Sequence, residues 1–293
     1  MIWIVGCNGM LGKELKDIFD KNSISHIESG REVDITNYDA LLSFAEKQKE
    51  IKSQYISFIV NCAAYTAVDK AEDDIDACRM LNAAGAGNIA KAAKTLNAML
   101  IHISTDYVFD GRSNKPYKED DPKNPTGVYG AAKFEGENAV LNNCPDSYII
   151  RTAWLYGRYG KNFVQTMVAL MNSRTEINVV NDQKGCPTWT QDLCGAIVSI
   201  IQNKPDFGVY HYTNEDVCTW FEFAAAIYKA GREFGIIKNQ CLVKPCTSAE
   251  YPSKVTRPAY SVLDKTKIKA ALNIQIPGWK ESLLEYLKQV SNE

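Results

Sequence analysis

The sequence predicts an α/β fold, a doubly wound parallel sheet with a smaller domain interleaved with it. The chain has 293 residues, which is enough for roughly two domains of about 150 residues each. Short apolar runs alternate with helical patterns through the first half, as in right-handed βαβ units around a parallel sheet. After Trp154 this rhythm loosens. The second part has no low-complexity linker before it, so we expect it to pack directly onto the first part.

The first half supplies most of the predicted sheet. Its strands are short apolar runs of the kind buried on both faces of a parallel sheet. They lie at 2–5, 26–28, 58–63, 99–104 and 148–151. Apolar residues at helical spacing predict the helices between them, at 11–19, 38–49, 76–96 and 129–142. Gly85 and Gly87 lie inside the third of these helices, where we expect close packing against another element.

The second half predicts fewer strands and more helices. Helical patterns occur at 162–171, 191–202, 220–234 and 279–289. One strand is predicted at 209–212, and the segment 244–258 reads as a loop.

Composition and charge exclude several classes of function. The chain carries 33 Lys and Arg against 35 Asp and Glu, a formal charge of −2. A domain that binds duplex nucleic acid through its phosphates is clearly basic, so we expect no nucleic-acid partner. No apolar run approaches the ~20 residues of a membrane span. The first residues also lack the basic region and long apolar stretch of a signal peptide.

The cysteines indicate a reducing compartment. There are nine of them, with no Cys-x-x-Cys pair, and only three histidines. A structural zinc site needs four ligands at short spacing, and a secreted disulfide scaffold is usually shorter with an even cysteine count. We therefore expect free thiols, no metal site and a cytoplasmic protein.

A glycine-rich loop follows the first strand and opens the first helix. Its pattern is Gly-x-x-Gly-x-x-Gly, a variant of the dinucleotide fingerprint, in which glycines allow the tight turn, the approach of a pyrophosphate and close helix packing. The N-terminus of the helix then faces the pyrophosphate with unpaired N–H groups. A tight turn that binds nothing is the alternative. The candidate cofactor residues here are Gly6, Asn8, Gly9, Met10, Leu11 and Gly12.

Arg31 lies near the predicted end of the second strand. An acidic residue at this position usually binds the ribose 2′-hydroxyl of NAD, whereas an arginine accommodates the 2′-phosphate of NADP. Glu28 and Glu32 lie close in the sequence, and a solvated surface arginine is the alternative. We expect NADPH as the cofactor, with NADH as the second choice.

Tyr129 and Lys133 form a candidate catalytic pair. Their spacing of four residues places both side chains on one face of the predicted helix. A free tyrosine has a pKa near ~10, and a neighbouring ammonium group lowers the pKa of a phenol. Thr105 follows the fourth strand, at the edge where α/β sheets bind ligands. Its hydroxyl is placed to bind the phenol oxygen or a substrate carbonyl.

Together these motifs resemble the dTDP-4-dehydrorhamnose reductase family of the extended short-chain dehydrogenase/reductase superfamily. The resemblance covers nearly the whole chain. It rests on segments 6–12, 33–37, 61–69, 104–111, 129–133, 151–157, 182–188 and 257–261. It implies a Rossmann-type domain and NADPH-dependent reduction of the C4 keto group of a dTDP-linked sugar.

The resemblance also implies roles for individual residues. The catalytic residues are Tyr129, Lys133 and Thr105. Asp34 and Ile35 flank the adenine, and Ala63, Ala64 and Tyr65 form the loop under the ribose and pyrophosphate. The implied substrate contacts are Val68, Thr105, Asp106, Trp154, Gln183 and Arg257. For Trp154 a packing role in the core is the alternative.

The resemblance also sets the expected domain boundaries. The nucleotide-binding domain spans 1–154, with later returns near 176–215. The smaller substrate-binding domain spans 155–175 and 216–293.

Two departures from the family pattern and two rival functions bear on this interpretation. Related dehydratases have a catalytic Glu where this chain has Tyr107, which argues against dehydration. Some family members form magnesium-bridged dimers. Glu14 matches one such ligand, but residues 189–191 offer no carboxylate for another, so we expect no magnesium and a monomer or homodimer. The rival functions are a nucleotide-sugar 4-epimerase and a non-catalytic subunit like the regulatory β subunit of methionine adenosyltransferase.

Overall fold

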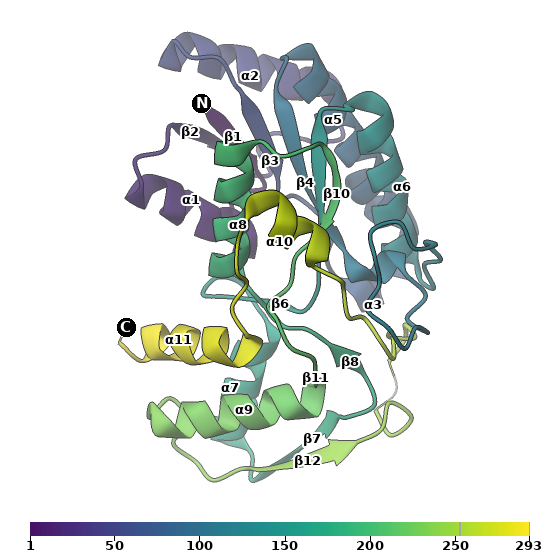
Figure 1. Ribbon diagram of the computed structural model, residues 1–293, viewed down its shortest axis with the longest axis vertical. Coiled ribbons are helices and arrows are strands. Elements are labelled where there is room, and N and C mark those ends of the chain that lie inside the picture. The colour runs from purple at the N-terminus through teal and green to yellow at the C-terminus, as the bar shows by residue number, and fades with distance from the viewer. Residues whose placement is uncertain (252, 293) are drawn as a thin grey trace.

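The computed structural model describes residues 1–251 and 253–292. Its central layer is a six-stranded, wholly parallel sheet in the order β10-β5-β4-β3-β1-β2 (Figure 1). The strands are β1 (Ile2–Val5), β2 (His26–Ser29), β3 (Phe58–Asn61), β4 (Met99–Thr105), β5 (Ser147–Thr152) and β10 (Gly208–His211). All six predicted strands and the doubly wound fold class are confirmed. The strand order reverses between β1 and β3, and ligands of such sheets bind at this switch point.

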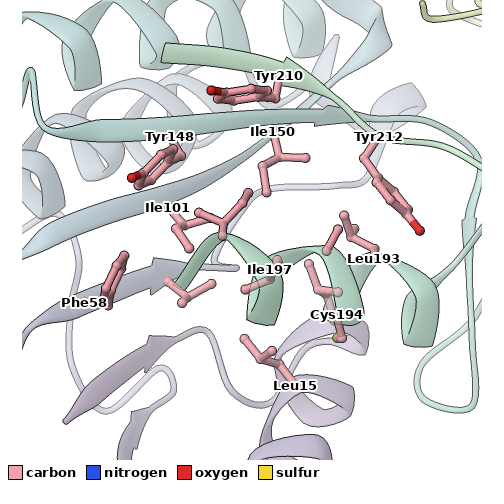
Figure 2. Packing of buried hydrophobic residues seen from close by; sticks show 14 of the residues in the cluster. Leu15, Phe58, Ile101, Tyr148, Ile150, Leu193, Cys194, Ile197, Tyr210 and Tyr212 are labelled. Atoms are coloured by element: carbon pink, nitrogen blue, oxygen red, sulfur yellow. The ribbon is translucent and has the colours of Figure 1, made fainter. Parts of the chain in front are cut away.

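Helices cover both faces of the sheet. One face is covered by α1 (Met10–Lys21), α8 (Thr190–Asn203) and α10 (Thr266–Leu272), and the other by α2 (Tyr38–Lys52), α5 (Ala86–Thr95) and α6 (Val128–Asn143). Side chains alternate between these faces along each strand, so Ile4 belongs to the first core and Trp3 to the second. Figure 2 shows the first core, where side chains of α8 and Leu15 of α1 gather against Ile101 and Ile150 of the sheet.

The predicted helix at 76–96 is divided into three parts. It consists of α4 (Ile75–Arg79), a π-helical turn η1 (Met80–Gly85) and α5. Packing explains the wider turn, because a Cβ on Gly136 of α6 would lie 2.0 Å from the carbonyl oxygen of Asn82. The two backbones therefore approach without a side chain between them. As predicted, a Cβ on Gly85 or Gly87 would also crowd a neighbouring element, at 2.8 Å from Ile35 and 3.2 Å from Ala139 respectively.

A second lobe lies at the other end of the molecule (Figure 1). Its elements are β6 (Leu155–Tyr156), α7 (Phe163–Ser173), β7 (Glu176–Val180), β8 (Lys184–Gly185), β9 (Thr188–Trp189), β11 (Cys218–Thr219), α9 (Trp220–Glu233), β12 (Leu242–Cys246) and α11 (Trp279–Ser291). They enclose a separate core around Tyr156, Phe223 and Trp279. The four predicted helices of the second half are confirmed.

The prediction of a loop at 244–258 is wrong at its start. Residues 244–246 belong to β12, which pairs in parallel with β7. Pro245 hid this strand from sequence reasoning, because proline is usual only at sheet edges, and here the sheet has only two strands. Pro252, in the same predicted loop, lies outside the described residues.

The predicted domain boundaries stay a prediction, to which strand pairing adds detail. Helix α8 packs against the large sheet and strand β10 is part of it. Strand β7 instead pairs with β12 in the second lobe. Helix α10 packs in the core of the large sheet. We therefore favour a division in which the chain crosses between the two lobes several times.

Candidate active site

The glycine loop lies where β1 meets α1. Gly6 has a φ of +81°, and a Cβ there would lie 2.6 Å from the backbone nitrogen of Ala63. A Cβ on Gly12 would lie 2.3 Å from the carbonyl oxygen of Gly6. Helix α1 has Gly9 as its N-cap, with no side-chain hydrogen bond and no acidic residue in its first turn. This N-terminus lies at the switch point and fits a pyrophosphate group.

The loop after β2 contains Glu32 and Arg31 and lies beside Asn8 of the glycine loop. The Asn8 side chain lies against Gly30, and the Glu32 carboxylate accepts a hydrogen bond of 2.5 Å from the Gly30 N–H. Arg31 is exposed beside them. Arg31 thus belongs to the loop that follows β2, where a ribose phosphate of NADP would lie in a fold of this type.

Asp34 and Ile35 follow directly and have different environments. Asp34 is exposed and accepts hydrogen bonds from the backbone N–H and hydroxyl of Thr36, at 2.9 Å and 2.8 Å. Ile35 is buried against Gly85. The Asp34 carboxylate thus stabilises its own turn.

The loop after β3 is fixed by two buried asparagines that sequence reasoning missed. Asn61 Oδ1 accepts from the Ala63 N–H at 3.0 Å. Asn82 accepts from the Tyr65 N–H at 2.9 Å and donates to the Tyr65 carbonyl at 3.0 Å. The backbone of Ala63, Ala64 and Tyr65 is therefore rigid beside the glycine loop. Asn61 belonged to a recognised motif, but nothing in the sequence marked Asn82.

Thr105, Tyr129 and Lys133 come together as predicted, between the end of β4 and the start of α6. Thr105 lies close enough to Tyr129 to affect the pKa of its phenol, and the Tyr129 ring meets that of Tyr107 edge-on, with centroids 5.6 Å apart. The Thr105 hydroxyl donates to Asp106 Oδ1 at 3.0 Å. Lys133 is buried, and its Nζ donates to the Ile103 carbonyl at 2.6 Å.

We predicted that the Lys133 ammonium lowers the pKa of the Tyr129 phenol, but in the structure that pKa is raised. Burial raises the pKa of Tyr129, and Thr105 opposes this shift only in part. The Lys133 amino group is turned toward the Ile103 carbonyl, and burial lowers its own pKa to about 8. Tyr129 is therefore held in its protonated form, the form that donates a proton.

Asp106 lies next to this group and is buried. Burial raises the pKa of its carboxyl to about 6, against hydrogen bonds from Thr105 and Ser261 that favour the charged form. Near neutral pH the carboxylate therefore remains an acceptor, suited to a sugar hydroxyl.

Arg257 is held by the residue that follows Val68. Val68 begins the short helix α3 (Val68–Ala71), whose Asp69 binds the Arg257 guanidinium at 2.9 Å. Tyr107 is close enough to this ion pair and to Asp106 to be affected by their charges. Burial raises its pKa to about 12, the two carboxylates also raise it, and Arg257 lowers it. The structure thus connects the predicted substrate residues through Tyr107, which sequence reasoning had used only as an argument against dehydration.

Trp154 and Gln183 lie on the second lobe. Trp154 has a φ of +50°, which is uncommon for a bulky residue. Its indole stacks on Trp220 with centroids 3.5 Å apart, and a Cβ on Gly185 would lie 2.5 Å from it. Gln183 is buried and donates to Ser248 Oγ at 2.8 Å. Both side chains have packing partners, so their substrate contacts stay predictions.

Glu14, the one candidate magnesium ligand in the sequence, is held within the protein. Glu14 is buried on α1 and accepts a hydrogen bond of 3.2 Å from Thr190. Across residues 1–251 and 253–292, no group of three or more His, Cys, Asp or Glu side chains could hold a metal ion. No helix in the same residues is long and apolar enough to cross a membrane.

Comparisons with known proteins give one consistent result. The family model described as "RmlD substrate binding domain" matches residues 1–292. A dTDP-4-dehydrorhamnose reductase of Aggregatibacter actinomycetemcomitans is 38% identical over 287 residues, covering 96% of each chain. The crystal structure of a dTDP-4-dehydrorhamnose reductase from Clostridium acetobutylicum has a TM-score of 0.91 at 40% identity, covering 99% of each chain. A Bacillus anthracis dTDP-4-dehydrorhamnose reductase in complex with NADP has a TM-score of 0.90 at 36% identity, covering 98% of each chain.

Proposed function

Since the chain belongs to the RmlD substrate binding domain family, we propose that it reduces the C4 keto group of dTDP-4-dehydro-β-L-rhamnose with NADPH. The product is dTDP-β-L-rhamnose, and the step is the last in dTDP-L-rhamnose biosynthesis. The observation that carries the proposal is the cluster of Thr105, Tyr129 and Lys133 at the edge of the large sheet. Relatives that match nearly the full length of the chain are named for this reaction.

The residues present fit NADPH. Gly6 and Gly12 leave no room for side chains, and the uncapped N-terminus of α1 offers backbone N–H groups to the pyrophosphate. Arg31 is exposed beside the Asn8 and Gly30 contact, where a 2′-phosphate would be neutralised. A related enzyme solved with NADP supports this choice. NADH remains the second choice, because Glu32 lies at the same place.

The mechanism follows from the protonation states of the side chains. NADPH supplies the hydride when it is bound. Tyr129 donates its phenolic proton to the developing C4 oxyanion, since burial keeps the phenol protonated. The Thr105 hydroxyl turns from Asp106 to donate to that oxygen, and this stabilises its negative charge. Lys133 is buried, and its charged form holds the nicotinamide ribose.

The substrate side of the site lies toward the second lobe. The Asp106 carboxylate accepts hydrogen bonds from the sugar, and Val68 and Arg257 contact the nucleotide diphosphate. Trp154 and Gln183 close the site from the second lobe. Tyr107 cannot act as a carboxylate base, so the arrangement favours reduction over elimination.

The direct test is consumption of NADPH with dTDP-4-dehydrorhamnose made in place by the upstream enzymes. We expect NADPH oxidation that depends on the sugar nucleotide, with dTDP-rhamnose as the product by NMR. A 6-deoxytalose product would correct the C4 stereochemistry. Absence of NADPH oxidation together with tightly bound NAD in the purified protein would favour the epimerase, and absence of both would favour a regulatory subunit.

We also propose a cytoplasmic location. All nine cysteines are free thiols, and seven of them are buried. This usage suits a reducing compartment. The enzyme needs no partner chain to complete the catalytic cluster, which suits either a monomer or a homodimer.

A further inference from the structure

A chain of buried polar groups lies beneath Lys133 and has no role in the mechanism above. His102 on β4 and Asn61 on β3 are paired residues of adjacent parallel strands, so their side chains share one face of the sheet. Both are 1% exposed. His102 Nε2 lies 3.5 Å from Lys133 Nζ, and His102 Nδ1 lies 3.0 Å from Asn61 Nδ2. The three side chains therefore connect the catalytic helix to the loop after β3.

The orientation of the Asn61 amide is fixed by its other partner. The backbone N–H of Ala63 can only donate, so the amide oxygen of Asn61 must face it, at 3.0 Å. The NH₂ group then faces His102 Nδ1 and donates to it. His102 Nδ1 must therefore be an acceptor without a proton.

This orientation determines the tautomer of His102. Burial and the charge of Lys133 hold the pKa of His102 well below its ordinary value, so the ring is neutral at neutral pH. A neutral ring without a proton on Nδ1 has its proton on Nε2. His102 thus directs an N–H donor toward Lys133. An ammonium group cannot accept this hydrogen bond, whereas a neutral amine can.

Some of the other groups around Lys133 favour its charged form, whereas burial favours its neutral form. The Ile103 carbonyl accepts from Nζ at 2.6 Å and favours the ammonium. Glu137, one turn along α6, also favours the ammonium. Burial disfavours the ammonium form and lowers the pKa of Lys133 to about 8. His102 on β4 supplies the one donor directed against the charged form.

We propose that His102 is a positioning residue that keeps Lys133 close to the balance between its charged and neutral forms, by directing an Nε2–H donor at its amino group. The proposal rests on the proposed function for its catalytic consequence. The charged form of Lys133, which holds the nicotinamide ribose, is then lost as the pH rises, so Lys133 sets the alkaline limb of activity. Asn61 sets this arrangement and also holds Ala63 in the cofactor loop, so one amide serves both parts of the site.

The first test needs neither a variant nor a substrate. Two-bond ¹H–¹⁵N NMR spectra of the whole protein report the tautomer of each histidine, and the chain has only three of them. We expect His102 to be neutral at neutral pH with its proton on Nε2. A proton on Nδ1, or a charged ring, would overturn the proposal.

The second test measures the effect on Lys133. In His102→Gln a side-chain oxygen can accept from the Lys133 ammonium, and in His102→Asn the acceptor for Asn61 is kept while the Nε2–H is lost. We expect both variants to move the alkaline limb of the kcat/KM profile upward by about one pH unit, the size of one hydrogen bond to a charged group. The matched control is His26→Gln, since His26 lies on the edge strand β2 and we expect its profile to match that of the unmodified protein.

The outcomes separate this proposal from the proposed function. If the His102 variants fold, turn over and keep the alkaline limb of the unmodified protein, the proposal fails while the function stands. If the unmodified protein does not oxidise NADPH with the sugar nucleotide, the function fails. In that case the titration of Lys133, followed by NMR of ¹³C-labelled lysine in the same variants, still decides the proposal. Should both variants fail to fold, the tautomer of the unmodified protein decides it.

Discussion

At the scale of single residues, Tyr129 combines two properties. Burial raises the pKa of its phenol, and Thr105 lies close enough to oppose this shift in part. A phenol held protonated is suited to donating a proton to an alkoxide, which is the stronger base. We expect Tyr129→Phe to lower kcat by about 10²-fold or more, the usual scale for a general acid. Steady-state NADPH oxidation measures this loss.

Binding of NADPH should survive the Tyr129→Phe substitution, because the glycine loop is untouched. Fluorescence titration with NADPH checks this point. Tyr55→Phe is the control, since Tyr55 is 74% exposed. Turnover by Tyr129→Phe at the rate of the unmodified protein would remove Tyr129 from the mechanism.

Sequence reasoning predicted the catalytic cluster but not its electrostatics. The spacing of Tyr129 and Lys133 on one helix and the position of Thr105 at a strand end were sufficient to bring the three together. The direction of the Lys133 amino group was not predictable, because it depends on the Ile103 carbonyl, on another element. Asn82 was missed for a similar reason, since its partners are backbone atoms 17 residues away.

At the scale of elements, the contact between α6 and the π-helical turn η1 holds the cofactor loop indirectly. Asn82 lies in this turn, and its carbonyl oxygen would be 2.0 Å from a Cβ on Gly136. We expect Gly136→Ala to lower the free energy of unfolding by about 1–3 kcal/mol, because the helices must move apart. Urea denaturation measures this change.

Gly195 on α8 is the matched control for Gly136. A Cβ there would meet no atom within 4 Å, so Gly195→Ala gains only helix propensity. We expect it to raise the free energy of unfolding by about 0.5–1 kcal/mol. If Gly136→Ala were stabilising to the same degree, the close contact described between α6 and η1 would be wrong.

Long periodic elements were predictable and short paired ones were not. Every helix of ten or more residues except α5, which was expected as part of a longer helix, corresponds to a predicted helix of its own. The two-residue strands and the short helices α3 and α10 give too few residues for a period to show. Strands β7 and β12 were missed because β12 contains Pro245 and because the two strands form a separate two-stranded sheet outside the βαβ pattern of the large sheet.

At the scale of the whole molecule, buried histidines make stability depend on pH. Burial and the Arg151 charge lower the pKa of His211 to about 3 from its ordinary value of 6.5. Between these values the unfolded chain binds a proton that the folded chain does not, so the free energy of unfolding rises with pH. The stabilisation is complete above the unfolded pKa and is lost as the pH falls. His102 acts in the same direction.

We therefore expect the free energy of unfolding to fall on acidification below about pH 6.5, by about 1.4 kcal/mol per pH unit for each histidine. Asp106 acts in the opposite direction, because its folded pKa is raised to about 6 from 3.8, and it offsets part of the loss below that value. Urea denaturation across this range measures the slope. His211→Gln should flatten it, and an unchanged slope in that variant would contradict the assignment of the slope to His211.

The strand order has a consequence for how the protein is made. The sixth strand of the large sheet, β10, is reached only after the chain has passed through α7, β7 and α8. During synthesis, which proceeds from the N-terminus, β5 is therefore an open edge until residue 211 has left the ribosome, and the apolar face that α8 covers is bare for nearly as long. Pairing with β10 closes the β5 edge, but α10 completes the cover of that face only later, so the nascent chain exposes apolar surface until residue 272 has been made.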